Sequence, residues 1–359
     1  MTSIRTVIAA TGSHIPSVRV KNEQFLEHEF WGSDRKKIDK TNREIVEQFE
    51  AITGIRERRY VPDGVVTSEI ATDAARKALQ SSGIDPESLD AIIVAHNFGD
   101  LRDGSRSTDQ VPALAARVKA ALKIHRPSTV AWDLLFGCPG WLQGVIQADY
   151  QIRAGDAKRV MVIGAETLSR ISDPHDRDSL IYADGAGATI LEARQTDEAV
   201  GILSHAVRSD TLHHSSMLFM GKSYNEEVFL EALFLKMEGR KVYKYAVGTV
   251  ASGIKESLDK AGVGINDVAK ILIHQANGKM DEAILAALYQ LYGIKEPPPE
   301  VMPMTIGFLG NTSVATIPTM LDLILRGELD GHRIAPGDNL VFASVGAGMH
   351  INAVVYRVP

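Results

Sequence analysis

The chain has 359 residues, of which 45% are hydrophobic and 23% charged, with a formal net charge of −6. This length supports one large domain or two joined halves. The acidic balance disfavours nucleic acid as the main partner, because phosphate binding requires a basic face. The single cysteine, Cys138, excludes an internal disulfide and a cysteine-based metal site. We therefore expect a reducing compartment, in which a lone thiol is either inert packing or reactive.

Targeting and membrane signals are not evident. Residues 1–19 do not combine a basic start, an apolar run and a small-residue cleavage site, so we expect no signal peptide. No apolar run approaches the roughly 20 residues needed to cross a bilayer. The sequence therefore predicts a cytoplasmic chain that does not enter the membrane.

Two pairs of segments repeat the same order of features. Residues 81–97 and 260–276, which start 260 − 81 = 179 residues apart, each combine a helix end, a glycine, an acidic turn and a buried strand. Further on, FGCPGWLQGVIQ (136–147) and LGNTSVATIPTM (309–320) each join a glycine to a small polar residue and a helix. Each of these helices leads to another buried strand, which favours an internal duplication.

The alternation of strands and helices predicts an α/β fold of two similar halves with largely buried sheets. We assign the N-terminal half to residues 1–198 and the C-terminal half to residues 199–359. Residues 209–236 are the least regular part of the chain. They are expected to form a long, partly helical connection that either walls a ligand cavity or is a plain surface excursion.

Cys138 stands between Gly137 and Pro139, after the strand-like stretch TVAWDLLF. Proline is well tolerated in a first helical turn, so Cys138 is expected to open a helix. Helix N-terminal amides and the helix dipole would then depress the pKa of the thiol. The residue is either a nucleophile presented to a thioester or a small buried hydrophobe.

Two further residues are candidates for the same site. His274 ends the buried strand KILIH, and ligand sites of α/β folds lie at the carboxyl ends of strands. Asn311 lies in GNTS at a helix start, where a helix cap is the ordinary role. If the halves are pseudo-symmetric, Asn311 and Cys138 occupy equivalent helix starts and converge with His274 between the halves.

These three side chains suit one type of chemistry. The cysteine accepts an acyl group, and a neutral histidine and an asparagine donate hydrogen bonds to a second thioester carbonyl. Such donors stabilise the enolate that forms when malonate loses CO2. The glycine-rich stretch 346–348 allows a close backbone approach near the acyl oxyanion.

Several motifs resemble the thiolase superfamily, specifically its β-ketoacyl-ACP synthase III branch. They keep the family's order and cover nearly the whole chain. The resemblance implies a thiolase fold, with two βαβαβαββ halves in a five-layer αβαβα arrangement, and an acyltransferase of fatty acid biosynthesis. The motifs are ITGIRERR (52–59), Cys138 in its glycine context, DPHDRDSLIYADGAGATIL (173–191), MEGRKVYKYAV (237–247), IHQAN (273–277), GNTSVATIP (310–318) and VGAG (345–348).

The resemblance also implies the residue roles. Cys138 is similar to the family's nucleophile, and His274 and Asn311 are similar to the pair that promotes decarboxylation and stabilises the enolate. The acyl oxyanion hole is implied to use the backbone N–H groups of Cys138 and Ala347. The family is normally a homodimer without a metal or organic cofactor, and it takes acyl-carrier-protein or coenzyme A thioesters as substrates.

Four more residues match binding positions of the family. Asn277 and Arg177 fall on positions that contact coenzyme A or the phosphopantetheine arm. Lys244 and Lys279 fall on basic positions that dock the carrier protein or contact phosphate, although solvated surface is the simpler role for such lysines.

The chain also departs from the family's pattern. Gln48 and Ile52 stand where the family has a tryptophan and an arginine that hold the coenzyme A nucleotide, which favours a carrier-protein-bound donor. Bulky residues flank the nucleophile, and two loops look longer than in housekeeping members. These features, Phe136, Trp141 and the loops 98–108 and 209–236, suggest a specialised member of secondary metabolism.

Three other functions stay open. Condensation of two acyl or β-ketoacyl thioesters without decarboxylation would need an extra base, for which Asp100, Asp103 and Glu166 are candidates. Acyl transfer to oxygen or nitrogen would use Cys138 alone, and the presence of Asn311 counts against it. A non-catalytic subunit that only binds a partner would have no need of the cysteine, histidine and asparagine together.

Overall fold

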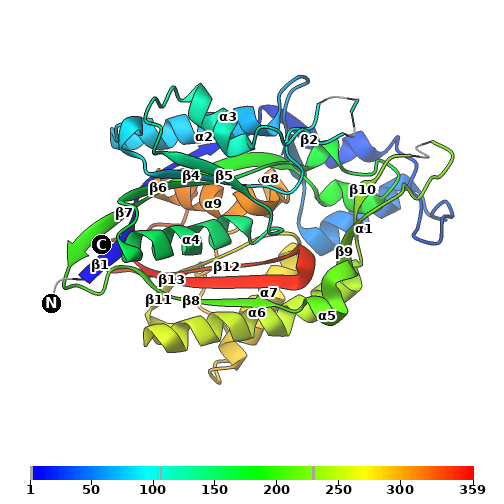
Figure 1. Ribbon diagram of the computed structural model, residues 1–359. Helices are drawn as coiled ribbons and strands as arrows, with labels where there is room; N and C mark the ends of the chain where they lie inside the picture. The colour runs from blue at the N-terminus through cyan, green and yellow to red at the C-terminus, as the bar shows by residue number, and fades with distance from the viewer. Residues whose placement is uncertain (1–2, 103, 106, 229–230) are drawn as a thin grey trace.

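The computed structural model describes residues 3–102, 104–105, 107–228 and 231–359, and these form five layers (Figure 1). Two helices cover the outer face of the first sheet, two lie between the sheets, and two cover the outer face of the second sheet. The predicted αβαβα arrangement is therefore confirmed. In this order the helices are α2 (Thr67–Ser82) and α3 (Leu114–Ala121), α4 (Gly140–Ala154) and α9 (Thr316–Leu325), and α6 (Gly239–Ala261) and α7 (Gly278–Gln290).

The first sheet has five strands in the order β1-β7-β6-β4-β5. Strand β4, with sequence AIIVA, is buried at every residue and runs parallel to both of its neighbours, β5 and β6. Such an apolar run is typical of a parallel strand that is covered on both faces. The strands are β1 (Ser3–His14), β4 (Ala91–Ala95), β5 (Val130–Leu134), β6 (Arg159–Thr167) and β7 (Asp184–Thr196).

The second sheet has four strands in the order β11-β12-β13-β8, one fewer than the predicted pattern. Residues 296–304 follow α7 where the further strand was expected, and four of them are prolines. Because proline has no backbone N–H, it cannot complete a ladder of hydrogen bonds. Ile271 still donates a 2.8 Å backbone hydrogen bond to Val301 there. The strands are β8 (Gly201–Ser209), β11 (Val268–Ile273), β12 (Asn339–Gly346) and β13 (His350–Arg357).

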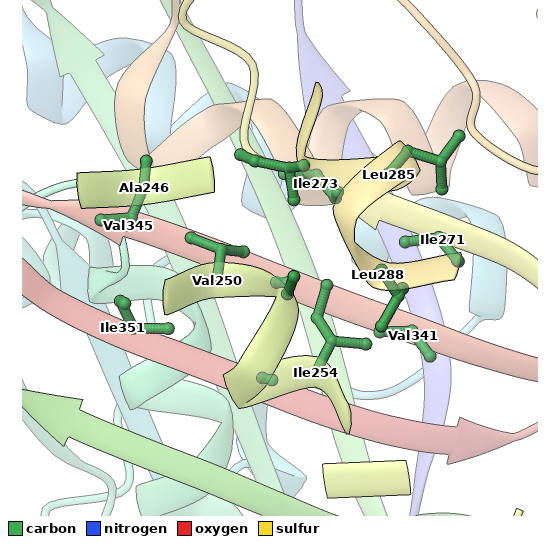
Figure 2. Close-up of a cluster of buried hydrophobic side chains, with 14 of the residues drawn as sticks. Ala246, Val250, Ile254, Ile271, Ile273, Leu285, Leu288, Val341, Val345 and Ile351 are labelled. Carbon is green, nitrogen blue, oxygen red and sulfur yellow. The ribbon is translucent and has the colours of Figure 1, made fainter. Parts of the chain in front are cut away.

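Helices α6 and α7 hold the second sheet through a large apolar cluster (Figure 2). Ala246, Val250 and Ile254 recur every four residues along α6, so they form one face of that helix. They lie over β11, β12 and β13 together with Leu285 and Leu288 of α7. Burying one large aliphatic side chain contributes about 1.5–3 kcal/mol. This packing fixes the end of β11, from which His274 continues.

The two central helices are buried between the sheets. In α9 every residue from Thr316 to Ile324 is buried, as expected for a helix that is covered on all sides. Its partner α4 packs against β6 of the first sheet and β12 and β13 of the second. The chain segments that lead into these two helices therefore meet between the halves.

The segment 209–236 contains a short helix and a hairpin beside the second sheet (Figure 1). Lys236 of this hairpin is buried in ion pairs with Asp173 and Asp176, which anchor it to the first half. Within the described residues, no helix is long and apolar enough to span a membrane. The remaining elements are β2 (Val18–Lys21), α1 (Asn42–Thr53), β3 (Glu57–Tyr60), α5 (Thr211–His214), β9 (Leu218–Gly221), β10 (Phe234–Met237) and α8 (Ile306–Leu309).

Candidate active site

Cys138 lies on the tight turn between β5 and α4. The helix begins at Gly140, two residues later than the sequence predicts, with Pro139 as its N-cap. A methyl group on Gly137 would lie 2.7 Å from the Ala347 amide nitrogen, and one on Gly346 would lie 2.5 Å from the Cys138 amide nitrogen. The two loops therefore touch through their backbones. This contact brings the amides of Cys138 and Ala347 into the same small region.

The expected depression of the Cys138 pKa was wrong. Burial raises the pKa of the thiol to about 11, since an apolar surrounding disfavours the thiolate. A hydrogen bond from the Ser313 hydroxyl and one from the cysteine's own backbone lower the pKa, but by less, and the nearby Glu166 raises it further. The free enzyme therefore holds a protonated thiol.

His274 follows the last residue of β11 and is 3% exposed. Burial lowers its pKa to about 4, and a hydrogen bond with the Ser313 backbone opposes this shift only in part. Its Nδ1 lies 3.3 Å from Oγ1 of Thr316. The imidazole is consequently neutral at pH 7, the form that can donate a hydrogen bond without carrying charge.

Asn311 is held between α8 and α9 by its backbone. Its N–H donates to the Ile181 carbonyl at 3.0 Å, and its own carbonyl accepts from Ala183 at 2.8 Å. The side-chain oxygen accepts a 2.8 Å hydrogen bond from the Ser313 N–H, so it caps a local turn and does not open α9 directly. The amide nitrogen is thereby left as the group that can donate into the site.

Cys138, His274 and Asn311 line one cavity of about 210 Å³. Most of the other lining side chains are apolar, and β9 and β10 supply several of them. Residues 209–236 therefore help to wall a ligand cavity, one of the two roles that the sequence left open. The apolar lining residues include Phe98, Leu168, Leu218, Met220, Leu235, Val345 and Met349.

A surface cleft of about 1380 Å³ adjoins this cavity. The two spaces share five lining residues, which we call the neck: Phe219, Met237, Val242, Ala276 and Met280. Several cationic side chains line the cleft, namely Arg35, Lys40, Arg177, Lys222, Arg240 and Lys241. Carboxylates line the cleft as well, namely Asp34, Asp176, Asp178 and Glu238. A long ligand in the cleft can reach the cavity through the neck.

The four predicted binding residues divide into two groups. Arg177 and Asn277 line the cleft, and the Asn277 side chain also caps α7 by accepting from Met280 N at 3.1 Å. Lys244 and Lys279 are exposed on α6 and α7 and do not line the cleft. The roles of all four residues stay predictions.

The two candidate extra bases that the structure describes, Glu166 and Asp100, do not line the cavity. Glu166 is fully buried, and its Oε2 accepts from the Asn97 N–H at 3.0 Å and from the Asn97 side chain at 2.7 Å. Asp100 accepts from the Ser68 N–H and pairs with Arg117, both at 2.7 Å. Asp103 lies outside the residues that the structure describes. Neither described carboxylate is therefore placed to take a proton from a bound thioester.

The bulky neighbours of the nucleophile lie outside the cavity as well. Phe136 stacks on His350 with ring centroids 4.1 Å apart, and Trp141 packs edge-on against Phe342 in the core. They support the loop and the helix on either side of Cys138 but do not fill the acyl space.

Sequence reasoning missed three residues of the two spaces. Asn97 and Ser313 line the cavity, and Trp31 lines the cleft beside Gln48 and Ile52. Asn97 follows closely after β4, and Ser313 is two residues from Asn311, so both positions could have been found from the strand-end rule and the GNTS motif. Trp31 lies outside the regular elements, and its place becomes visible only in the folded chain.

An acyl thioester on a cysteine needs donors for its own carbonyl and for that of a second thioester, and this cavity brings candidate donors for both together with Cys138. That combination, on five α/β layers, defines a condensing acyltransferase of the thiolase fold. The family model of 3-oxoacyl-[acyl-carrier-protein] synthase III matches residues 132–211, and the model of its C-terminal region matches residues 258–358.

Full-length relatives agree with this match. The chain is 35% identical to β-ketoacyl-[acyl-carrier-protein] synthase III of Erythrobacter litoralis, over 99% of both chains. It is 34% identical to the protein of the same name from Rhizorhabdus wittichii, over 98% of this chain and 99% of that one. The chain therefore belongs to the β-ketoacyl-ACP synthase III family.

Solved structures show the same fold. The 3-oxoacyl-[acyl-carrier-protein] synthase III of Aquifex aeolicus superposes with a TM-score of 0.79 at 29% identity, over 98% of this chain and 99% of that one. The 3-oxoacyl-(acyl carrier protein) synthase III of Pseudomonas aeruginosa superposes with a TM-score of 0.79 at 28% identity, over 99% of this chain and 98% of that one. The thiolase fold that the sequence motifs imply is thus confirmed.

Proposed function

We propose that the chain joins an acyl group to a malonyl-thioester by decarboxylative Claisen condensation. The observation that carries the proposal is the meeting of Cys138, His274 and Asn311 in one apolar cavity, although they come from three distant segments. An apolar wall suits an acyl chain, and a buried site strengthens hydrogen bonds to a developing oxyanion.

The reaction divides into two halves. In the first, the Cys138 thiol gives up its proton and its sulfur attacks the carbonyl carbon of the donor thioester. The donor's carbon–sulfur bond breaks, the acyl group stays on Cys138, and the donor sulfur takes up a proton and leaves as a thiol. In the second, the malonyl group loses CO2, and the enolate that remains attacks the acyl carbonyl. The tetrahedral intermediate then expels the Cys138 sulfur and releases the β-ketoacyl thioester.

Each half uses its own hydrogen-bond donors. The N–H groups of Cys138 and Ala347 are assigned to the oxyanion of the acyl group, because their loops are in backbone contact. His274 and Asn311 are assigned to the enolate oxygen. A neutral imidazole fits this role because it donates without first losing a proton to the carboxylate of malonate.

The test is intact-protein mass after incubation with a panel of acyl-CoA and acyl-carrier-protein donors, followed by malonyl-thioester. We expect an acyl adduct that disappears with release of CO2 and a β-keto product. Cys138→Ser should abolish the adduct. Asn311→Ala should still form it but release CO2 more slowly, and the exposed Asn266→Ala serves as the matched control.

Two outcomes would point elsewhere. A stable adduct that never gives CO2 or a β-keto product would indicate acyl transfer to oxygen or nitrogen. An absence of adduct from every donor would indicate a binding subunit. Equal loss of acylation and decarboxylation in Asn311→Ala would contradict the separate role of the carboxamide.

The same assay addresses the donor. We propose that the phosphopantetheine arm of acyl carrier protein or coenzyme A lies in the cleft, with Arg177 and Asn277 beside it and Lys244 and Lys279 near its mouth. Gln48 and Ile52 line this cleft in place of the family's nucleotide-holding pair, which favours the carrier protein. Acylation by free acyl-CoA as fast as by the carrier protein would overturn that preference.

We also propose that the enzyme is a homodimer, joined along β5. This strand is an open edge of the first sheet, and nearby Val130 and Leu135 are each 58% exposed. A twofold axis would let two copies pair at this edge and cover these side chains. Val130→Lys should yield monomers in light scattering, whereas Val18→Lys, on the exposed face of β2, should leave the dimer intact.

The proposed reaction needs no metal or organic cofactor, because the thioesters supply the activated carbon and the loss of CO2 drives condensation. We place this chemistry in the cytoplasm, and its unusual nucleotide positions favour secondary metabolism. Full activity of protein treated with a chelator, with purified thioesters alone, is the expected result; a requirement for added metal would contradict it.

A further inference from the structure

Ser313 combines an unusual backbone with contacts to the whole site. Its φ is +51°, in the left-handed region that residues other than glycine rarely adopt, and the residue is 3% exposed. Its N–H donates to Asn311, its backbone is hydrogen-bonded with His274, and its Oγ lies 3.4 Å from the Cys138 sulfur. A strained residue thus touches all three proposed catalytic side chains.

The direction of the Ser313 hydroxyl follows from its second partner. The Asn97 side-chain nitrogen donates a hydrogen bond to Ser313 Oγ at 3.4 Å. A serine hydroxyl has one proton and can accept through its lone pairs. Because Asn97 occupies the oxygen as a donor, the serine proton is free to point at the Cys138 sulfur.

The orientation of Asn97 is set in turn by Glu166. The Glu166 Oε2 accepts from both the backbone and the side-chain nitrogen of Asn97. An ionised carboxylate can only accept, so it holds the amide nitrogen toward itself and keeps the amide oxygen away. Glu166 lies near the end of β6, opposite Gly185 of β7. Its Oε2 carries both of these hydrogen bonds, whereas its Oε1 is buried and has no hydrogen-bond partner among the described residues.

We propose that Glu166, Asn97 and Ser313 form a hydrogen-bond chain that positions a donor on the Cys138 sulfur. The proposal rests on the function given above, in which this sulfur is negatively charged twice: when it attacks the donor and when the condensed product leaves. Glu166 and Asn97 are positioning residues, since only Ser313 contacts the reacting sulfur.

The hydrogen bonds that run from Glu166 through Asn97 to Ser313 offset part of the free-energy cost of burying the Cys138 thiolate. Burial raises the pKa of Cys138 to about 11, and the Ser313 hydrogen bond acts in the opposite direction. The other titratable groups that face the thiol from neighbouring elements are neutral His274, Tyr182 and Glu166. Glu166 itself disfavours the thiolate by its charge, so its benefit lies in orienting Asn97.

The test is the rate of Cys138 alkylation by iodoacetamide across a pH series, in the full chain without substrate. The rate follows the fraction of thiolate. Ser313→Ala and Asn97→Ala should each raise the apparent pKa of the thiol by about one unit, seen as a roughly tenfold lower rate at about pH 8. Thr189→Val, which removes a buried hydroxyl from β7, is the matched control for fold and should alkylate as wild type does.

Two substitutions at Glu166 separate orientation from charge. Glu166→Gln keeps an oxygen that accepts from Asn97 and removes the charge, so alkylation should be as fast as in wild type or faster. Glu166→Ala lets the Asn97 amide turn, so the alkylation should be slower than in Glu166→Gln. Equal rates in the two variants would overturn the role of Glu166.

The proposal fails if folded Ser313→Ala and Asn97→Ala both follow the wild-type pH profile. Circular dichroism and urea unfolding show whether each variant folds. If Ser313→Ala does not fold, the pH profile of Asn97→Ala alone decides whether the proposal holds. Because alkylation needs neither acyl donor nor malonyl-thioester, its outcome is independent of whether the chain catalyses condensation.

Discussion

Replacing Gly346 by alanine should separate folding from catalysis. This glycine has an extended backbone, with φ of −165°, that any residue can adopt, so the substitution introduces no left-handed strain. The added methyl group would instead lie 2.5 Å from the Cys138 amide nitrogen, about 0.9 Å closer than the 3.4 Å at which ordinary contact begins. One of the two loops must therefore move by most of an ångström.

The movement acts on the acyl oxyanion hole. Loss of one oxyanion donor costs about 10²–10³-fold in kcat, and a shift of about 1 Å in a reacting group costs about 10²-fold. We expect a fall in kcat of about 100-fold for Gly346→Ala. Overpacking of this kind costs about 1–3 kcal/mol of folding free energy, which a domain with so large a core can absorb.

The assay compares kcat, acylation rate and urea unfolding for Gly346→Ala with those for Gly248→Ala. Gly248 lies in α6, where a methyl group would meet nothing within 4 Å, so this control should retain full activity. Turnover within a few-fold of wild type in a folded Gly346→Ala variant would refute the reasoning, because the backbone contact would then be dispensable.

Other predictions concern pH, the neck and the buried ion pairs. The pKa of His274 falls from 6.5 to about 4 on folding, so between these pH values the unfolded chain binds more protons than the folded chain. The free energy of unfolding should therefore fall as the pH drops from 6.5 to 4, by about 3 kcal/mol at most. The pKa of Glu166 rises from 4.5 to about 7 on folding, so Glu166 makes the free energy of unfolding fall as pH rises through that window. The test is therefore the difference in the free energy of unfolding between His274→Gln and wild type, measured across pH. A difference that stays constant with pH would contradict the prediction for His274. Phe219→Ala should widen the neck and speed alkylation of Cys138 by a bulky maleimide more than by iodoacetamide; an equal change for both reagents would exclude a gating role. Lys236→Met should lower the free energy of unfolding by about 3–5 kcal/mol, because its two buried aspartates lose their cation, and urea titration measures this.

Much of the fold was predictable because buried strands and duplicated turns leave strong local patterns. The stretches AIIVA (91–95) and ILI (271–273) are apolar and buried at every position, and both lie in strands. The missing strand of the second sheet shows the limit of this reasoning. The prolines of EPPPE (296–300) indicate a stiff turn, but their effect on strand pairing depends on which neighbouring strand the segment would join.

The meeting of the three candidate residues in one cavity was predictable, but the electrostatics of that cavity were not. IHQAN and GNTS correctly singled out His274 and Asn311 as neighbours of Cys138 in one cavity. The sign of the Cys138 pKa shift could not follow from its helix position, because it depends on desolvation by β9, β10 and other segments far away in the chain. The hydrogen-bond chain through Asn97 likewise becomes visible only when strand ends are placed side by side.

The high pKa of the Cys138 thiol also affects how fast oxidants react with the protein when no substrate is bound. Peroxide attacks thiolates, and the progress from sulfenic to sulfinic acid follows thiolate character and access. Cys138 is partly exposed within its cavity, but a thiol whose pKa is raised to about 11 offers little thiolate. The free enzyme should consequently tolerate oxidative stress that would inactivate enzymes whose nucleophile rests as an exposed thiolate.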